Sequence, residues 1–418
     1  MIGCALLALG LVLETASQLR LAAFPLGIGE ACLVIWLGLA SLQLMTRSRI
    51  CNPTALLWLL AFWACFIFIQ SFGAFLALLR PEIIDPGLVV HDIFAYLLVA
   101  AVTCLAAATL KPEGTLRHTL WFMIGFWITA TIAQLALGWD YFSIPSVDPW
   151  YWDRFRGWSE NPNQLAIYCA VFTPLSLHMA LTAKRFGRLV AGLSCIATFV
   201  VGRLTKSDTF LISMSLSIPL FIALRLRSWL TSHEYRWSLR FAAAAITLMA
   251  LVPLSLSLLP YAAATAGDVE GIAAGMMKDH GGEGTKETAD LRLSLWHDAL
   301  HAGLESGSLG LGPGPHLEKP SGITDRGVPL PVEAHSTLLD VYTQGGLLGV
   351  IAVSSLLLGT LVLLLRARLD ALAVLIFALA IFSISHFILR HPTVWFAVTL
   401  GLVMGSARRT SAHLRVGS

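Results

Sequence analysis

The chain has 418 residues, of which 56% are hydrophobic and 13% are charged. A soluble globular domain carries about a quarter charged residues, so this composition excludes that class and predicts a polytopic integral membrane protein. The formal net charge of +3 does not indicate the orientation of the chain, because orientation in a membrane depends on how the charges are distributed. The seven cysteines lie in or beside apolar runs without paired spacing, which predicts neither a disulfide framework nor a metal site.

Apolar runs that could cross a bilayer as helices recur from one end of the chain to the other. We predict an all-α integral membrane fold with about twelve transmembrane helices, in a single polytopic domain over residues 1–418. The first run lacks a basic region and a small-residue cleavage site, so we interpret it as a short span and not as a removed signal peptide. The predicted cores are 2–15, 27–45, 54–79, 88–110, 119–138, 164–183, 188–203, 208–225, 240–260, 338–365, 371–388 and 394–407.

Lys and Arg are distributed unevenly between alternate connections of these spans. If the N-terminus is inside, the inner connections and the C-terminal tail hold most of the Lys and Arg, as the positive-inside bias requires. We therefore predict that both termini are cytoplasmic. The same orientation makes residues 261–335, which contain more Asp and Glu than Lys and Arg, a long periplasmic loop that caps the bundle between spans 9 and 10.

This long loop shows local order in its sequence. Leu293, Trp296, Leu300 and Leu304 recur at helical spacing among polar residues, which predicts an amphipathic helix. The following "GSLGLGPGP" predicts a turn-rich segment. The two halves of the chain show no matching broken helices, which is unfavourable to a transporter built from inverted repeats.

Basic residues on the predicted outer face depart from the positive-inside bias. The first such group is Arg154 and Arg156, which follow an aromatic-rich loop. Asn161 and Pro162 then begin the next span. Asn161 suits an N-cap and Pro162 the first helical turn, which is the purely structural interpretation. Aromatic rings suit the headgroup interface, and the two arginines suit a lipid phosphate held there.

A second place is the tight outer turn "VGRLTKSDTFL". Arg203 and Lys206 are both basic on the predicted outer face, and Asp208 lies at a helix start, where the helix dipole favours a carboxylate. An ordinary interfacial turn with snorkelling side chains is the alternative interpretation.

The third and fourth places flank the end of the long loop. Arg292 has Asp290 and Asp298 near it in the sequence, so a surface salt bridge is the alternative to a functional role. His335 starts a long apolar span, and Arg390 lies on a neighbouring outer turn. A single histidine at the end of a span is more often a polar cap than a catalyst, so His335 alone does not indicate an enzyme.

Taken in order, these pieces resemble the O-antigen ligase and polymerase superfamily of bacterial envelope glycosyltransferases. The pattern consists of an Arg-x-x-Gly…Asn-Pro-Asn element before a span, a Leu-Thr-x-Ser turn, an Arg-x-x-x-Trp helix, a Gly-x-Gly-Pro-Gly loop, and a histidine that starts a span with Gly-x-x-Gly downstream. The matching residues are Arg154, Gly157, Asn161, Pro162, Asn163, Leu204, Thr205, Ser207, Arg292, Trp296, Gly310, Gly312, Pro313, Gly314, His335, Gly346 and Gly349.

The resemblance implies a transfer of glycan from an undecaprenyl-diphosphate carrier to an acceptor sugar hydroxyl, at the periplasmic face of the bacterial inner membrane. It implies no cofactor and no metal ion, His335 as general base, and Arg292 as its catalytic partner. The expected partners are the lipid-linked oligosaccharide, a glycan or lipid A core acceptor, membrane lipid and other polysaccharide assembly proteins, but no nucleic acid. The implied ligands of the diphosphate and glycan are Arg154, Arg156, Asn163, Arg203, Lys206 and Arg390.

These roles are chemically reasonable for the residue types. A sugar hydroxyl is a poor nucleophile, and an imidazole with a pKa near neutrality is a suitable base for it. Guanidinium groups remain charged and bind phosphate oxygens bidentately as charge develops on the leaving diphosphate. Direct displacement predicts inversion at the anomeric carbon, and no paired carboxylates indicate a covalent intermediate.

One position departs from the family pattern. Members commonly have an arginine after Leu-Thr-x-Ser, where this chain has Asp208. A carboxylate does not bind phosphate directly, so Lys206 or Arg203 would have to supply the charge, or Asp208 would orient such a cation. Loss of activity is a further possibility.

The sequence is compatible with four functions. Because the 261–335 segment is acidic on balance and the family arginine is replaced, we favour a polymerase of O-antigen or exopolysaccharide repeats over a ligase that transfers glycan to the phosphate-bearing lipid A core. A transporter of lipid-linked sugars would need ionisable residues at mid-membrane depth, where these spans have few. A catalytically silent scaffold is the third alternative.

Overall fold

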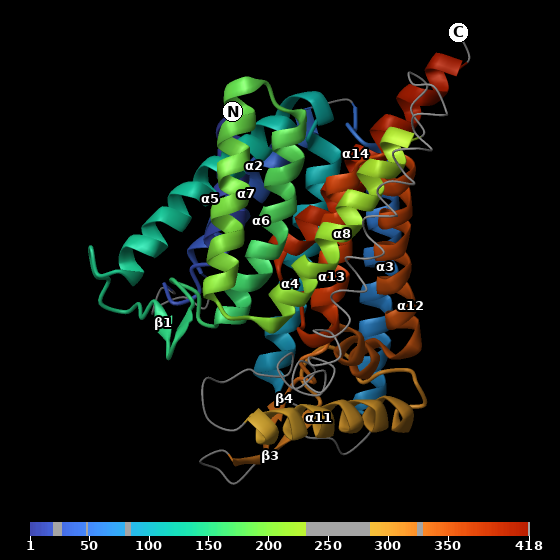
Figure 1. Ribbon diagram of the computed structural model, residues 1–418. Helices are drawn as coiled ribbons and strands as arrows, with labels where there is room; N and C mark the ends of the chain where they lie inside the picture. The colour runs from blue at the N-terminus through green and yellow to red at the C-terminus, as the bar shows by residue number, and fades with distance from the viewer. Residues whose placement is uncertain (20–26, 47–48, 80–84, 231–284, 324–328, 417–418) are drawn as a thin grey trace.

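The computed structural model describes residues 1–19, 27–46, 49–79, 85–230, 285–323 and 329–416. The N-terminus and the C-terminal part of α14 lie at one end of a helical bundle, and α11 and two short hairpins lie at the other (Figure 1). The helices are α1 (Ile2–Leu13), α2 (Ile28–Thr46), α3 (Pro53–Ala77), α4 (Pro86–Thr109), a π-helical turn (Pro112–Leu116), α5 (Arg117–Gly138), α6 (Pro162–Thr182), α7 (Arg185–Leu204), α8 (Asp208–Leu230), α11 (Thr285–Glu305), α12 (Thr337–Arg366), α13 (Asp370–Ser385) and α14 (Pro392–Val416). The antiparallel hairpins pair β1 (Trp150–Tyr151) with β2 (Arg154–Phe155) and β3 (Leu317–Ile323) with β4 (Pro329–Val332).

The predicted all-α membrane fold is confirmed, whereas the number of twelve spans is not. Within the described residues, eight helices are long and apolar enough to cross a membrane, and α1 and α13 are shorter apolar helices. Each predicted span is occupied by a helix, apart from 240–260, which lies outside the described residues. The bounds agree within a few residues except at the end of α14, which continues beyond 407 to Val416.

The helices differ in how much of their apolar surface is buried within the bundle. α13 contacts α6, α8, α12 and α14, and most of its 16 residues are buried. A helix that is apolar all round belongs in such a central position. α3, by contrast, leaves large side chains such as Phe68 and Phe75 exposed, as expected for a face that meets lipid.

α12 changes direction at Gly346, and the glycine-rich loop fills the break. Gly346 has φ of +60° and ψ of −161°. The break frees backbone carbonyls, and the loop satisfies two of them: Leu311 N–H donates to Thr343 O and Gly312 N–H to Gln344 O, each at 2.8 Å. The same loop packs on α3, where a Cβ on Gly312 would lie 2.6 Å from Ala74 Cα. The predicted Gly-x-Gly-Pro-Gly loop is therefore a packing element between α3 and α12.

We expect Gly346→Ala to lower the melting temperature of the purified protein by several degrees. The added Cβ would lie 2.1 Å from Ser308 O, and the backbone conformation is one that only glycine adopts readily, with a strain of about 1–3 kcal/mol for other residues. Gly38→Ala is a matched control, because Gly38 lies in mid-helix on α2 with open space around it. Equal melting temperatures for both variants and the wild type would contradict this account of the break.

α11 exists where the sequence predicted a helix, but it packs through a different face. Leu293, Leu300 and Leu304 are 51%, 47% and 62% exposed, whereas Leu295 and Ala299 are buried. These two pack against the chain that enters α12. Of the predicted apolar stripe, Trp296 packs against this cluster, whereas its three leucines are exposed. The stripe that packs begins with Arg292, and a hydrophobic pattern alone does not select a stripe that includes a charge.

Candidate active site

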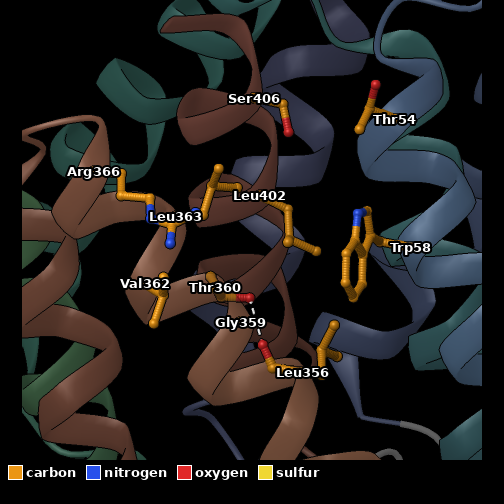
Figure 2. A pocket seen from close by; sticks show the side chains of 10 residues that line it. All are labelled: Thr54, Trp58, Leu356, Gly359, Thr360, Val362, Leu363, Arg366, Leu402 and Ser406. Atoms are coloured by element: carbon orange, nitrogen blue, oxygen red, sulfur yellow. Dashed lines mark hydrogen bonds between the residues drawn. The ribbon is translucent and has the colours of Figure 1, made fainter. Parts of the chain in front are cut away.

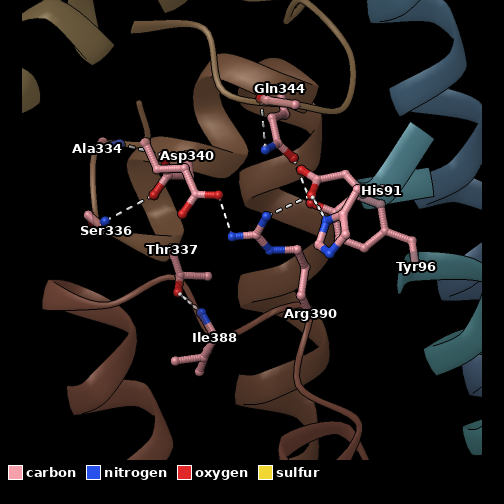
Figure 3. A network of polar contacts seen from close by, with 12 residues as sticks. His91, Tyr96, Ala334, Ser336, Thr337, Asp340, Gln344, Ile388 and Arg390 are labelled. Carbon is pink, nitrogen blue, oxygen red and sulfur yellow. Dashed lines mark hydrogen bonds and ion pairs between the residues drawn. The ribbon is translucent and has the colours of Figure 1, made fainter. Parts of the chain in front are cut away.

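His335 lies in a short connection, immediately before α12, whose backbone is held by one carboxylate. The His335 backbone adopts φ of +54°, a region that histidine visits more readily than most residues. Asp340, only 3% exposed, accepts the N–H of Ala334 at 2.7 Å and the N–H of Ser336 at 3.0 Å (Figure 3). Asp340 therefore holds the backbone on both sides of His335, which fixes the position from which the imidazole projects.

α11 supports the same connection from its other side. Trp296 Nε1–H donates to Ala334 O at 3.1 Å. Arg292 precedes Trp296 by one helical turn, so both side chains lie on one face of α11, and Arg292 is only 2% exposed. The fold thus brings together the predicted Arg-x-x-x-Trp helix and the predicted histidine, which are some forty residues apart in the chain.

Arg390 crosslinks this connection to α4. Its Nη1 lies 2.7 Å from Asp92 Oδ1, and its Nη2 contacts Glu333 Oε1 (Figure 3). Burial of Arg390 favours the neutral form, but the carboxylates of Glu333 and Asp92 outweigh it and raise the pKa of the guanidinium, which therefore stays charged. Its ring-face contact with Phe387, with the guanidinium carbon 4.8 Å from the centroid, also restricts the side chain.

Two further hydrogen bonds fix the surroundings of this cluster. Thr337 Oγ1–H donates to His386 O at 2.5 Å and accepts the N–H of Ile388 at 3.1 Å, which ties the start of α12 to the connection that carries Arg390. Tyr96 O–H donates to Gln344 Oε1 at 2.7 Å, which ties α4 to the break in α12.

Arg154 and Asn163 form a second cluster at the same end of the bundle. Arg154 is buried; its Nε–H donates to Thr205 O at 3.1 Å and its Nη2–H to Asn163 Oδ1 at 2.7 Å. Asn161 caps α6 as predicted, since its side chain accepts the N–H of Asn163 at 2.8 Å. The first two pieces of the sequence pattern, the Arg…Asn-Pro-Asn element and the Leu-Thr-x-Ser turn, are therefore in direct contact.

The other predicted ligands lie around this second cluster. Arg156 donates to Asp148 O at 2.9 Å and to Asp148 Oδ2 at 3.0 Å, so it holds the aromatic-rich loop together. Lys206 Nζ lies 2.5 Å from Asp153 Oδ2, and the hydrogen bond from Lys206 lowers the pKa of that carboxyl. Arg203 is exposed, and Asp208 is the first residue of α8, as predicted.

The two clusters are connected through α8 and α13. Thr209, one residue after Asp208, forms a hydrogen bond of 2.8 Å between its hydroxyl and that of Ser385. Ser385 adjoins His386, whose carbonyl accepts the hydroxyl of Thr337. Hydrogen bonds and short stretches of backbone therefore lead from the turn that contacts Arg154 to the start of α12 beside His335.

Three acidic residues of the first cluster were missed by the sequence interpretation: Asp92, Glu333 and Asp340. Ionisable side chains within membrane spans are costly and mark functional positions. Asp92 and Asp340 lie in the first two turns of α4 and α12, and this signal was available in the sequence. Glu333 lies in a polar stretch, where a carboxylate carries no comparable signal.

Comparison with known families supports the resemblance. Residues 191–354 match the family model described as O-antigen ligase. The matched range includes Arg203, Lys206, Arg292 and His335, whereas Arg390 and the Arg154 cluster lie outside it. No curated protein matches the chain. The matched region carries the predicted order of a Leu-Thr-x-Ser turn, an Arg-x-x-x-Trp helix and a histidine before a span, so this region of the chain is similar to the O-antigen ligase and polymerase superfamily.

Proposed function

We propose that this protein transfers glycan from an undecaprenyl-diphosphate carrier to an acceptor sugar hydroxyl at the periplasmic face of the bacterial inner membrane, without a metal ion. The observation that carries the proposal is the pair of hydrogen bonds that the N–H groups of Ala334 and Ser336, the residues on either side of His335, donate to buried Asp340. A polar cap needs no such support, whereas a general base must be held within hydrogen-bonding reach of the group it deprotonates.

In the proposed reaction, His335 takes the proton from the acceptor hydroxyl as its oxygen attacks the anomeric carbon. The bond between that carbon and the diphosphate oxygen breaks, and its electron pair leaves with the diphosphate. The configuration of the anomeric carbon is inverted, because one displacement occurs. Cationic side chains are required where the negative charge of the leaving group accumulates. We assign this role to Arg292, which is buried on α11 one helical turn before Trp296, the residue that bonds to Ala334.

The remaining basic residues divide into two proposed roles. Arg390 is bound to two carboxylates, which offset its charge, so we assign it to orienting the Glu333–Ser336 connection as well as to glycan binding. Arg154, with Asn163, Arg156, Arg203 and Lys206, would form the binding region for the diphosphate or glycan. Arg154 would act there by fixing the turn that presents Lys206.

A polymerase remains our preferred activity, with a ligase as the alternative. The turn that carries an arginine in other members here has Asp208, and its Lys206 is paired with Asp153. This turn therefore offers little net positive charge to the phosphates of a lipid A core, and electrostatic complementarity favours an acceptor with fewer charges.

The decisive experiment is the glycan profile of a strain that lacks the protein. A polymerase predicts that single repeat units accumulate on the carrier lipid and that long polymer is absent. Long polymer that persists on the carrier but is absent from lipid A would show a ligase instead. Complementation with a double variant, His335→Ala with Arg292→Gln, should fail although the protein is expressed. Normal glycan with that variant would exclude the enzymatic proposal altogether.

A further inference from the structure

A groove lies at the end of the bundle opposite to His335. α3, α12 and α14 enclose about 490 Å³ there, and Figure 2 shows the side chains that line it. His335 immediately precedes α12, whereas Arg366, which lines the groove, is the last residue of the same helix. The groove is therefore separate from the residues to which the transfer reaction is assigned. Its lining includes Thr54, Trp58, Gly359, Arg366, Leu402 and Ser406.

The groove is polar at its mouth and apolar in its depth. Thr54 lies at the start of α3 and Arg366 at the end of α12, so both mark the same surface of the bundle. Figure 2 shows Ser406 at the same level of the groove as Thr54. Leu356 lies ten residues before Arg366, which corresponds to about 15 Å along a helix. Half of a hydrocarbon core is also about 15 Å thick. The groove thus has the length and polarity of one leaflet of a bilayer.

Arg366 lines the groove, and further basic residues lie around the same end of α12. Two arginines bind the backbone at the end of α12: Arg227 donates to Leu365 O at 3.1 Å, and Arg408 donates to Ala367 O at 3.3 Å. Arg366 and Arg368 lie in the same corner, the junction of α12 and α13, as does the acidic Asp370, which is 4.0 Å from Arg225. The corner therefore carries a surplus of positive charge, and basic pockets of this kind between transmembrane helices attract anionic lipid headgroups.

We propose that this groove binds an anionic glycerophospholipid of the cytoplasmic leaflet. The phosphate would lie at Arg366, with the hydroxyls of Thr54 and Ser406 near the headgroup. An acyl chain would follow α12 past Gly359, where an added Cβ would meet no atom within 4 Å, and would contact Leu402. Such a lipid would hold together α3, α12 and α14 at this end of the bundle.

The experiment measures lipid binding to the full chain by native mass spectrometry and by thermal unfolding, after delipidation and addition of dioleoyl-phosphatidylglycerol or dioleoyl-phosphatidylcholine. We expect wild-type protein to retain phosphatidylglycerol at least tenfold more strongly and to melt at a higher temperature with it. Arg366→Gln should abolish the preference for the anionic lipid. Gly359→Leu, which fills the apolar space, should reduce the binding of both lipids.

Two controls keep the test specific. Arg185→Gln removes an exposed arginine at the start of α7, away from the groove, and Gly192→Leu places a leucine in open space on α7. Both should bind phosphatidylglycerol like the wild type. Equal retention of the two lipids by wild-type protein, or unchanged selectivity in Arg366→Gln, would overturn the proposal. Neither result bears on glycan transfer, because activity is not the readout.

Discussion

His335→Asn is expected to reduce the rate of glycan transfer by about 100- to 10,000-fold, the contribution that a positioned general base typically makes. Asn is chosen because it tolerates the positive φ of this position, so the backbone between Ala334 and Ser336 can remain as it is. The amide cannot take a proton from the acceptor. The measurement is kcat for transfer from a lipid-linked oligosaccharide, with purified protein in nanodiscs.

The matched control is His297→Asn. His297 lies on the exposed side of α11, so the same chemical change there should leave kcat within twofold of the wild-type value. The melting temperature of His335→Asn should equal that of the wild type, which separates a loss of chemistry from a loss of fold. Transfer by His335→Asn within tenfold of the wild type would show that His335 is not the base.

Asp340→Ala is expected to lower kcat by about 100-fold, because a displacement of about 1 Å in a reacting group is enough for such a loss. Without the carboxylate, the N–H groups of Ala334 and Ser336 lose their acceptor, and His335 is no longer held in place. Asp340→Asn should lose less, about tenfold, because its single carbonyl oxygen can still accept one of the two N–H groups. The expected signature is a fall in kcat with little change in the KM for the donor.

Asp370→Asn provides the control for a buried acid that starts an apolar helix. Asp370 begins α13 at the opposite end of the bundle from His335 and is nearly buried. Its replacement should lower thermal stability without the specific loss of kcat. If Asp340→Ala lowers only the melting temperature and transfers glycan at the wild-type rate, Asp340 is structural and the positioning role is wrong.

The residues of the candidate site could be predicted from the sequence, whereas the contacts between them could not. Arg292, Trp296 and His335 were identified from residue type, order and predicted membrane face. Their meeting depends on Trp296 bonding to Ala334, which no local pattern indicates. Arg390 was expected to bind phosphate, but its partner Asp92 is 298 residues away in the chain. An ion pair over that distance is set by how α4 and α14 pack, so the sequence did not reveal that Arg390 is already held by carboxylates.

The sequence by itself determined where the helices lie and which superfamily the chain resembles, because long apolar runs and ordered motifs are local properties of a chain in a membrane. Only the tertiary structure decided which face of α11 is buried, why α12 breaks at Gly346, and what holds His335. Each of these depends on backbone groups of one segment meeting another segment. A helix break or a positive φ is stable only where such partners satisfy the freed peptide groups.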